Sequence, residues 1–215
     1  MKKNLLVLAF LVGLLTCCKS EDAPIKPVKP TDPGSINKEY MSRAETTFAN
    51  IFKYYWSDKV RMMFGSYPNT LGTPQEPSSP DYDSHAFLWG LGSVVSAFNA
   101  IVQNTDNVDF RMTYESRLKE TLLKYYNTTK EPMCFGCFVN PHDQRLYDDA
   151  IWVGIDLADL YSKTKDSWYL DYAKSVWNFV LSGKDDELGG GVYWDENAKD
   201  SKNTCSNAPA VVLAL

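Results

Sequence analysis

Histidine is scarce in this sequence of 215 residues, which contains only His85 and His142. Histidine is the side chain that most often serves as a general base, and neither of the two stands in the context of a nucleophile elbow. The sequence also lacks an HExxH metal motif and a phosphate-binding glycine loop. These absences disfavour a Ser-His-Asp triad, a zinc peptidase and a nucleotide-binding protein.

The sequence also has no excess of positive charge and no long apolar run. The net charge is −5 and no basic stripe follows any predicted helix, so nucleic acid is not expected as a partner. The apolar run Leu5–Leu15 is too short to span a bilayer as a stable helix. Aromatic residues, by contrast, are plentiful, with 13 Tyr, 10 Phe and 6 Trp, and they suit either core packing or stacking on sugar rings.

Residues 1–17 have the order of a bacterial lipoprotein signal peptide. A short basic start precedes the apolar run, and Leu15-Thr16-Cys17-Cys18 resembles a lipobox. We expect lipidation of Cys18 after cleavage; Cys17 and a plain secretory signal are the alternatives. The next residues, Lys19–Asp22, resemble the acidic export tag of Bacteroidetes surface lipoproteins. They predict an outer membrane lipoprotein at the cell surface, with a periplasm-facing one as the alternative.

Residues 18–34 are predicted to form a lipid-anchored linker. Ala23–Gly34 is rich in proline, which rules out a helix interior or a central strand and favours an extended spacer. The remaining residues, 35–215, are enough for one domain with a substantial core.

Helical periodicity predicts that this domain is all-α. Apolar residues recur at helical spacing, and no alternation of strands and helices supports a parallel sheet. Nearly all-apolar helices alternate with amphipathic ones, which predicts two layers with inner helices enclosed by outer ones. The six predicted helices span residues 37–56, 85–102, 109–126, 148–163, 167–181 and 206–215.

Cys134 and Cys137 have the spacing of a metal or redox motif. A structural zinc site needs four ligands, and a lone CxxC outside a βαβ unit is weak evidence for either function. In an exported protein we expect a local disulfide or two free thiols instead. No metal and no cofactor is therefore predicted.

Asp148 and Asp149 are adjacent carboxylates at the start of an apolar helix. Charged aspartates are rarely buried without a partner. One interpretation is capping, in which an aspartate satisfies free N–H groups of the first turn. The other is catalysis, because crowding and burial would raise the pKa of one aspartate and leave a neutral acid beside an ionised carboxylate, as a retaining glycosidase requires. The pair by itself favours capping.

Two further segments carry a family resemblance. GGGVYW ends at Trp194, and SKNTCSNAPAVVLAL follows at residues 201–215. Together with the double aspartate and Trp152, their order and spacing resemble glycoside hydrolase family 76, the bacterial α-1,6-mannanases. The resemblance covers the second half of the chain, and the first half fits more loosely through aromatic-rich helices and SHAFLWG.

The resemblance implies an (α/α)6 toroid and a retaining glycoside hydrolase that cleaves α-1,6-linked mannan, such as the backbone of fungal cell-wall mannan. It implies Asp148 as the nucleophile and Asp149 as the acid/base. It also implies that three residues lie near the cleft at a helix start, where helix capping is the alternative role: Asn203, Ser206 and Asn207. Three aromatic residues are candidates for stacking on sugar, with core packing favoured for the second: Tyr147, Trp152 and Trp194.

Six predicted helices are half of such a toroid, so the chain is expected to be an N-terminal fragment whose activity on its own is uncertain. Two alternatives to a mannanase stay open. One is a non-catalytic surface glycan-binding lipoprotein, which has no need of the double aspartate. The other is a different carbohydrate-active (α/α)6 enzyme, such as an unsaturated glucuronyl hydrolase or a sugar epimerase. The expected partners are an α-mannan polysaccharide or oligosaccharide and, through the lipid anchor only, a membrane.

Overall fold

Six α-helices account for most of the residues that the computed structural model describes, which are 33–68, 85–139 and 144–215. The predicted all-α class is confirmed, and each predicted helix is present with ends shifted by only a few residues. The helices are α2 (Pro33–Tyr55), α3 (Leu88–Asn104), α4 (Val108–Tyr125), α5 (Tyr147–Thr164), α6 (Ser167–Ser182) and α7 (Thr204–Ala214).

The predicted signal peptide, Cys18 and most of the predicted linker lie outside the described residues. Helix α2 begins at Pro33, inside the predicted linker, and a proline suits the first turn because its missing N–H would be unpaired there anyway. The unit Lys38–Leu215 contains all the helices except this first part of α2. None of the helices in the described residues is long and apolar enough to cross a membrane.

Two short hairpins interrupt the helices. β1 (Trp56–Ser57) pairs with β2 (Met62–Met63), and β3 (Tyr126–Asn127) pairs with β4 (Cys134–Phe135), both antiparallel. Strands of two residues show no periodicity, which explains why the sequence did not predict them. His85 was expected to begin a helix, but it forms an isolated bridge to Phe64, and α3 begins only at Leu88.

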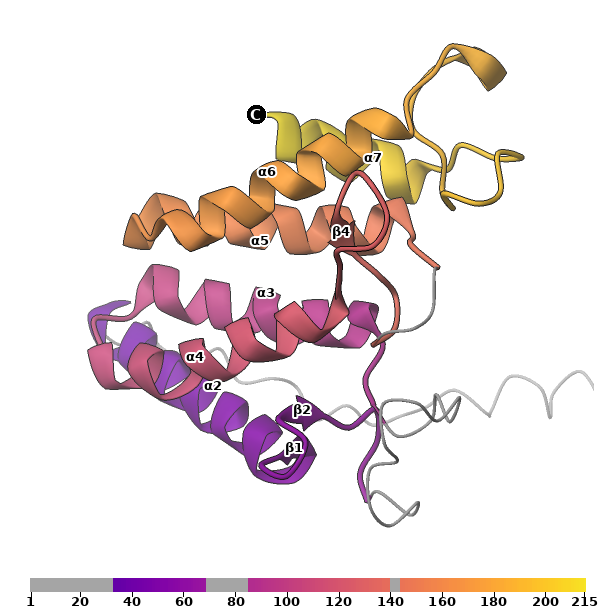
Figure 1. Ribbon diagram of the computed structural model, residues 1–215. Helices are drawn as coiled ribbons and strands as arrows, with labels where there is room; N and C mark the ends of the chain where they lie inside the picture. The colour runs from indigo at the N-terminus through magenta and orange to yellow at the C-terminus, as the bar shows by residue number, and fades with distance from the viewer. Residues whose placement is uncertain (1–32, 69–84, 140–143) are drawn as a thin grey trace, which may run out of the picture. The chain divides into compact units, whose positions relative to one another are not determined.

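Helix α5 lies in the middle of the domain, in contact with α3, α6 and α7. Gly154 permits this close packing, because an added Cβ atom would lie 2.8 Å from Val176 Cγ1 on α6 and 3.2 Å from Leu213 Cδ2 on α7. In Figure 1, α3, α5 and α7 begin on the same side of the domain. Residues from three helix N-termini and the loops before them therefore gather at one end.

The first three helices share an aromatic cluster. Phe48 on α2 lies 5.2 Å from Phe110 on α4 and 6.0 Å from Phe98 on α3, measured between ring centroids. Phe52 and Tyr114 extend the cluster, with centroids 4.6 Å apart. These rings lie in or against the hydrophobic core, so these aromatic residues serve packing rather than binding.

Candidate active site

The adjacent aspartates occupy the first turn of α5. Each is only 9% exposed. The residue at the N-cap position is Leu146, which has no side-chain capping bond, and neither carboxylate accepts a backbone N–H among the described residues. Capping therefore does not explain why two acids are buried at this helix end.

Asp148 lies toward the loop that follows α6 and toward the start of α7. The indole Nε1–H of Trp194 donates to its Oδ2 at 3.3 Å. Its Oδ1 is buried and has no hydrogen-bond partner in the described part of the chain. The thiol of Cys205 lies nearby, and burial, together with the charge of Asp148, raises the pKa of that thiol.

Asp149 lies toward α3 and toward the segment after β4. Burial and the like charge of Asp148 raise the pKa of Asp149 from 3.8 to about 6, against an opposing hydrogen bond from the Cys137 thiol. Asp149 also lines a pocket whose walls include Trp152 on α5 and Trp89 on α3. An acid that is partly protonated near neutral pH thus lies at an open cavity.

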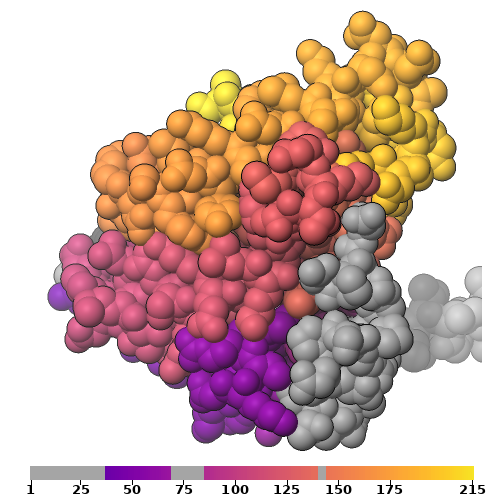
Figure 2. Space-filling view, in the orientation of Figure 1, coloured from indigo at the N-terminus to yellow at the C-terminus, as the bar shows by residue number. Residues whose placement is uncertain are grey.

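A buried ion pair holds this end of α5 in place. The Arg145 guanidinium is fully buried and donates from Nε to Glu196 Oε2 at 2.8 Å and from Nη1 to the Pro132 carbonyl at 2.7 Å. Lys130 completes the group, with its Nζ 3.1 Å from Glu196. In Figure 2 the β3–β4 hairpin, which contains Lys130, lies at the surface beside α6.

The backbone pairs the same two segments, the one before α5 and the one around Trp194. Leu146 and Asp195 form an isolated antiparallel bridge, and the Tyr147 N–H donates to the Trp194 carbonyl at 3.0 Å. Trp194 therefore satisfies a free N–H of α5 with its backbone and contacts Asp148 with its side chain. Arg145 and Glu196, which sequence reasoning missed, fix the register that brings Trp194 to the aspartate.

The glycine run forms the predicted turn and is tied to α7 by Asn207. Asn207 Oδ1 accepts from the Val192 N–H at 2.8 Å, and its Nδ2 donates to the carbonyls of Val192 and Asn203, both at 2.9 Å. Gly191 has φ +86°, and an added Cβ would lie 2.4 Å from Asn207 Oδ1. The amide of Asn207 thus ties the glycine turn to α7.

The other two predicted residues of this segment differ from each other. Asn203 is the N-cap residue of α7, but it contributes its backbone carbonyl and makes no side-chain capping bond. Ser206 is fully buried, and its Oγ has no hydrogen-bond partner among the described residues. Lys202, to which the sequence analysis gave no role, anchors the segment by donating to Asp185 Oδ1 at 2.6 Å.

The three predicted stacking residues are placed differently. Tyr147 is only 3% exposed, and its ring stacks on Phe179 with centroids 4.4 Å apart, so the structure places it in the core and not in the cleft. Trp194 is 37% exposed. Trp152, for which core packing was favoured, is 43% exposed beside Asp149. Two of the three therefore present indole surface at the carboxylates.

Cys134 and Cys137 are buried free thiols. Burial raises the pKa of each to about 12, so both are protonated at neutral pH. Of the two expected states, disulfide and free thiols, the structure has the second. Among the described residues no three His, Cys, Asp or Glu side chains come together as a metal site.

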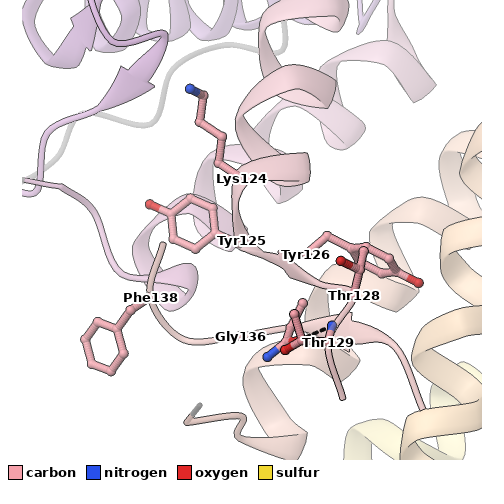
Figure 3. A pocket seen from close by; sticks show the side chains of 8 residues that line it. Lys124, Tyr125, Tyr126, Thr128, Thr129, Gly136 and Phe138 are labelled. Atoms are coloured by element: carbon pink, nitrogen blue, oxygen red, sulfur yellow. Dashed lines mark hydrogen bonds between the residues drawn. The ribbon is translucent and has the colours of Figure 1, made fainter. Parts of the chain in front are cut away.

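A second pocket lies at the β3–β4 hairpin. Figure 3 shows it between the end of α4 and the hairpin, with Lys124, Tyr126, Thr128 and Thr129 among its lining side chains. Neither Asp148 nor Asp149 lines it. The paired carboxylates are therefore the stronger candidate site.

Solved structures resemble the described helices. A family 76 glycoside hydrolase from a bovine Bacteroides thetaiotaomicron strain is 29% identical, with TM-score 0.67 over 81% of this chain and 36% of that one. A family 76 mannosidase from Bacteroides thetaiotaomicron VPI-5482 is 24% identical, with TM-score 0.67 over 81% of this chain and 47% of that one. No relative matches among curated proteins.

A third solved structure is a variant of the α-1,6-mannanase of Salegentibacter sp. HEL1_6. It is 20% identical, with TM-score 0.57 over 81% of this chain and 44% of that one. The variant is inactive, carries alanine in place of two consecutive aspartates, and is in complex with α-1,6-mannotetrose.

This chain spans less than half the length of each of these three solved structures, and its six described helices match about half of the (α/α)6 toroid. Residues 39–215 match the sequence family described as Glycosyl hydrolase family 76. Because that match covers most of the chain and includes the paired aspartates, the chain belongs to glycosyl hydrolase family 76.

Proposed function

We propose that this chain contributes the catalytic pair of a retaining glycoside hydrolase that cleaves α-1,6-linked mannan, with the backbone of fungal-type mannan as substrate. The observation that carries the proposal is the burial of two adjacent aspartates without capping bonds, one of them with its pKa raised to about 6. The inactive double variant of the Salegentibacter enzyme supports the same pair as the catalytic one.

Asp148 is the nucleophile in this proposal. It lies at the N-terminus of α5, where the helix dipole attracts negative charge, and it accepts the Trp194 indole N–H. The Trp194 bond holds the carboxylate at Oδ2, and the carboxylate attacks the anomeric carbon. The new bond from the Asp148 carboxylate to C1 forms as the C1–O bond to the leaving mannosyl unit breaks.

Asp149 is the acid and then the base. Its raised pKa keeps part of the population protonated near pH 6, so it can deliver a proton to the departing glycosidic oxygen. The resulting carboxylate then takes a proton from water as that water attacks C1, which releases Asp148 and restores Asp149. Two inversions at C1 give overall retention.

The location of the enzyme follows from the leader, which lies outside the described residues. We place the domain at the surface of the outer membrane, attached through lipidated Cys18 and a proline-rich spacer. Mass spectrometry of the cell-associated protein tests this, since a lipid-modified Cys18 as the first residue is expected and an intact Met1 would contradict it.

The activity is tested by NMR of the first sugar released from α-1,6-mannan by the full-length protein. Retention predicts the α-anomer first, followed by slow mutarotation. Initial release of the β-anomer would mean inversion and would remove the nucleophile role from Asp148. A protein that binds mannan equally well with Asn at both positions and never cleaves it would be a glycan-binding protein instead.

A further inference from the structure

All six tryptophans of the sequence lie in the described residues, and they divide into two groups. Trp56, Trp168 and Trp177 pack against the hydrophobic core. The other three do not belong to the core or to the residues packed on it, and all three lie at the paired carboxylates: Trp89, Trp152 and Trp194. Exposed indole surface in this protein is therefore concentrated at the candidate site.

Two of these tryptophans flank one pocket beside Asp149. Trp89 on α3 is 56% exposed, and Trp152 follows Asp149 by three residues on α5, so both residues of α5 lie on the same helix face. Ser93 and Ser96 continue the face of α3 below Trp89, four and seven residues further along the chain, and both line the pocket. The pocket thus combines indole walls, hydroxyl groups and one carboxyl group.

This combination matches the chemistry of a pyranose ring. One face of the ring presents C–H groups that pack on an aromatic surface, while its edge carries hydroxyl groups that need hydrogen-bond partners. The serine hydroxyls already have internal acceptors, since Ser93 donates to the Trp89 carbonyl at 3.2 Å and Ser96 donates to Asp156. Their oxygen lone pairs are left to accept from a sugar hydroxyl.

We propose that Trp89 and Trp152 form a stacking platform for the mannosyl unit on the leaving-group side of the scissile bond. This inference rests on the proposed function, because an acid that protonates the leaving oxygen must stand next to the leaving sugar. The pocket lies on the Asp149 side of the pair, whereas Asp148 is turned toward Trp194 and α7. Trp89 acts in substrate binding.

The test compares two substrates in the full-length protein. α-1,6-Mannotetraose places a mannosyl unit on the platform, whereas α-mannosyl fluoride, whose leaving group is a single atom, places no ring there. We expect Trp89→Ala to lower kcat/KM on the tetrasaccharide roughly tenfold, the range of one aromatic contact, and to leave kcat/KM on the fluoride unchanged. Trp89→Phe should recover part of the loss. Tyr40→Ala is the matched control, since Tyr40 is an exposed aromatic residue on α2 that lines none of these pockets.

An unchanged kcat/KM on the tetrasaccharide overturns the platform while the proposed function stands. An equal loss on both substrates also overturns it, because the effect would not come from the leaving-group side. If the wild type cleaves neither substrate, the proposed function fails. Binding of the tetrasaccharide, measured by calorimetry, then tests whether Trp89 contacts the sugar. Equal binding by wild type and Trp89→Ala, or no binding at all, overturns the platform.

Discussion

Helix α5 carries two kinds of buried carboxylate. Asp156 lies between α3 and α5, where Ser96 donates to its Oδ2 and Asn99 Nδ2 donates to its Oδ1 at 2.9 Å. Asp148, two turns earlier, has an oxygen without a partner. Burial raises the pKa of Asp156 as it does that of Asp149, so a raised pKa does not separate the two kinds of acid.

Hydrogen bonding separates Asp148 from Asp156. A buried polar group that has its partners contributes to the fold, whereas one left unsatisfied costs free energy and calls for an explanation such as catalysis. This difference, together with the position of Asp149 at a pocket, predicts opposite consequences for substitutions only seven or eight residues apart on one helix.

The largest effect is expected for Asp148→Asn. The amide cannot form the covalent intermediate, so kcat should fall by roughly 10⁴-fold or more on every mannoside, including those with good leaving groups. Folding should be retained, because no hydrogen bond to Oδ1 is lost. Steady-state kinetics beside a thermal melt measure both, and substantial activity on an aryl mannoside would show that Asp148 is not the nucleophile.

Asp149→Asn should have a smaller effect that depends on the substrate. Loss of the general acid should cost roughly 10²- to 10⁴-fold on mannan but much less on an aryl mannoside, whose leaving group needs little protonation. Added azide should restore part of the rate, since it attacks the intermediate without a general base. Equal losses on both substrates, with no rescue by azide, would argue against the acid/base role.

Asp156→Ala should change stability instead of chemistry. It leaves Ser96 without its acceptor and Asn99 with only its longer bond to Asp159, which should lower the free energy of unfolding by about 1–3 kcal/mol. The rate per folded molecule should stay near that of the wild type. Urea unfolding and active-site-normalised kinetics test this, and a stable but inactive variant would erase the distinction between the two kinds of carboxylate.

The pH dependence of stability compares the wild type with the Asp149→Asn variant. Because the pKa of Asp149 is about 6 in the folded protein and 3.8 ordinarily, its proton is held more tightly in the folded state. The stability that this proton contributes is present below about pH 4 and is lost as pH rises through about 6. Asp149→Asn should therefore gain stability relative to the wild type over that window, as measured by thermal melts. A constant difference across the window would contradict the raised pKa.

Much of the fold could be predicted because the signal is local. The six helices follow from apolar spacing, and even α5 and α7 were placed within two residues of their observed starts. The two-residue strands could not be predicted, and neither could the delayed start of α3, because His85 is held by a bridge to Phe64, a residue distant in the sequence.

Only some of the site residues could be predicted, again because contacts between distant parts of the chain leave no local signal. The double aspartate and Trp194 were identified from motifs, but what each side chain contacts depends on pairings across the fold. Asn207 lies in a predicted sugar-binding motif and yet binds the glycine turn. The sequence did contain a signal for one site residue that was not predicted. Arg145 is a charged residue just before an apolar helix, and a buried charge there needs a partner, which is Glu196.

The central claim is that Asp148 and Asp149 have separate roles, and covalent trapping tests it most directly. A fluorinated mannosyl fluoride that forms the glycosyl-enzyme quickly and hydrolyses it slowly should label the full-length protein once. After proteolysis, mass spectrometry should place the mannosyl adduct on Asp148, and Asp148→Asn should take up no label. An adduct on Asp149, or on any residue outside the pair, would contradict the account.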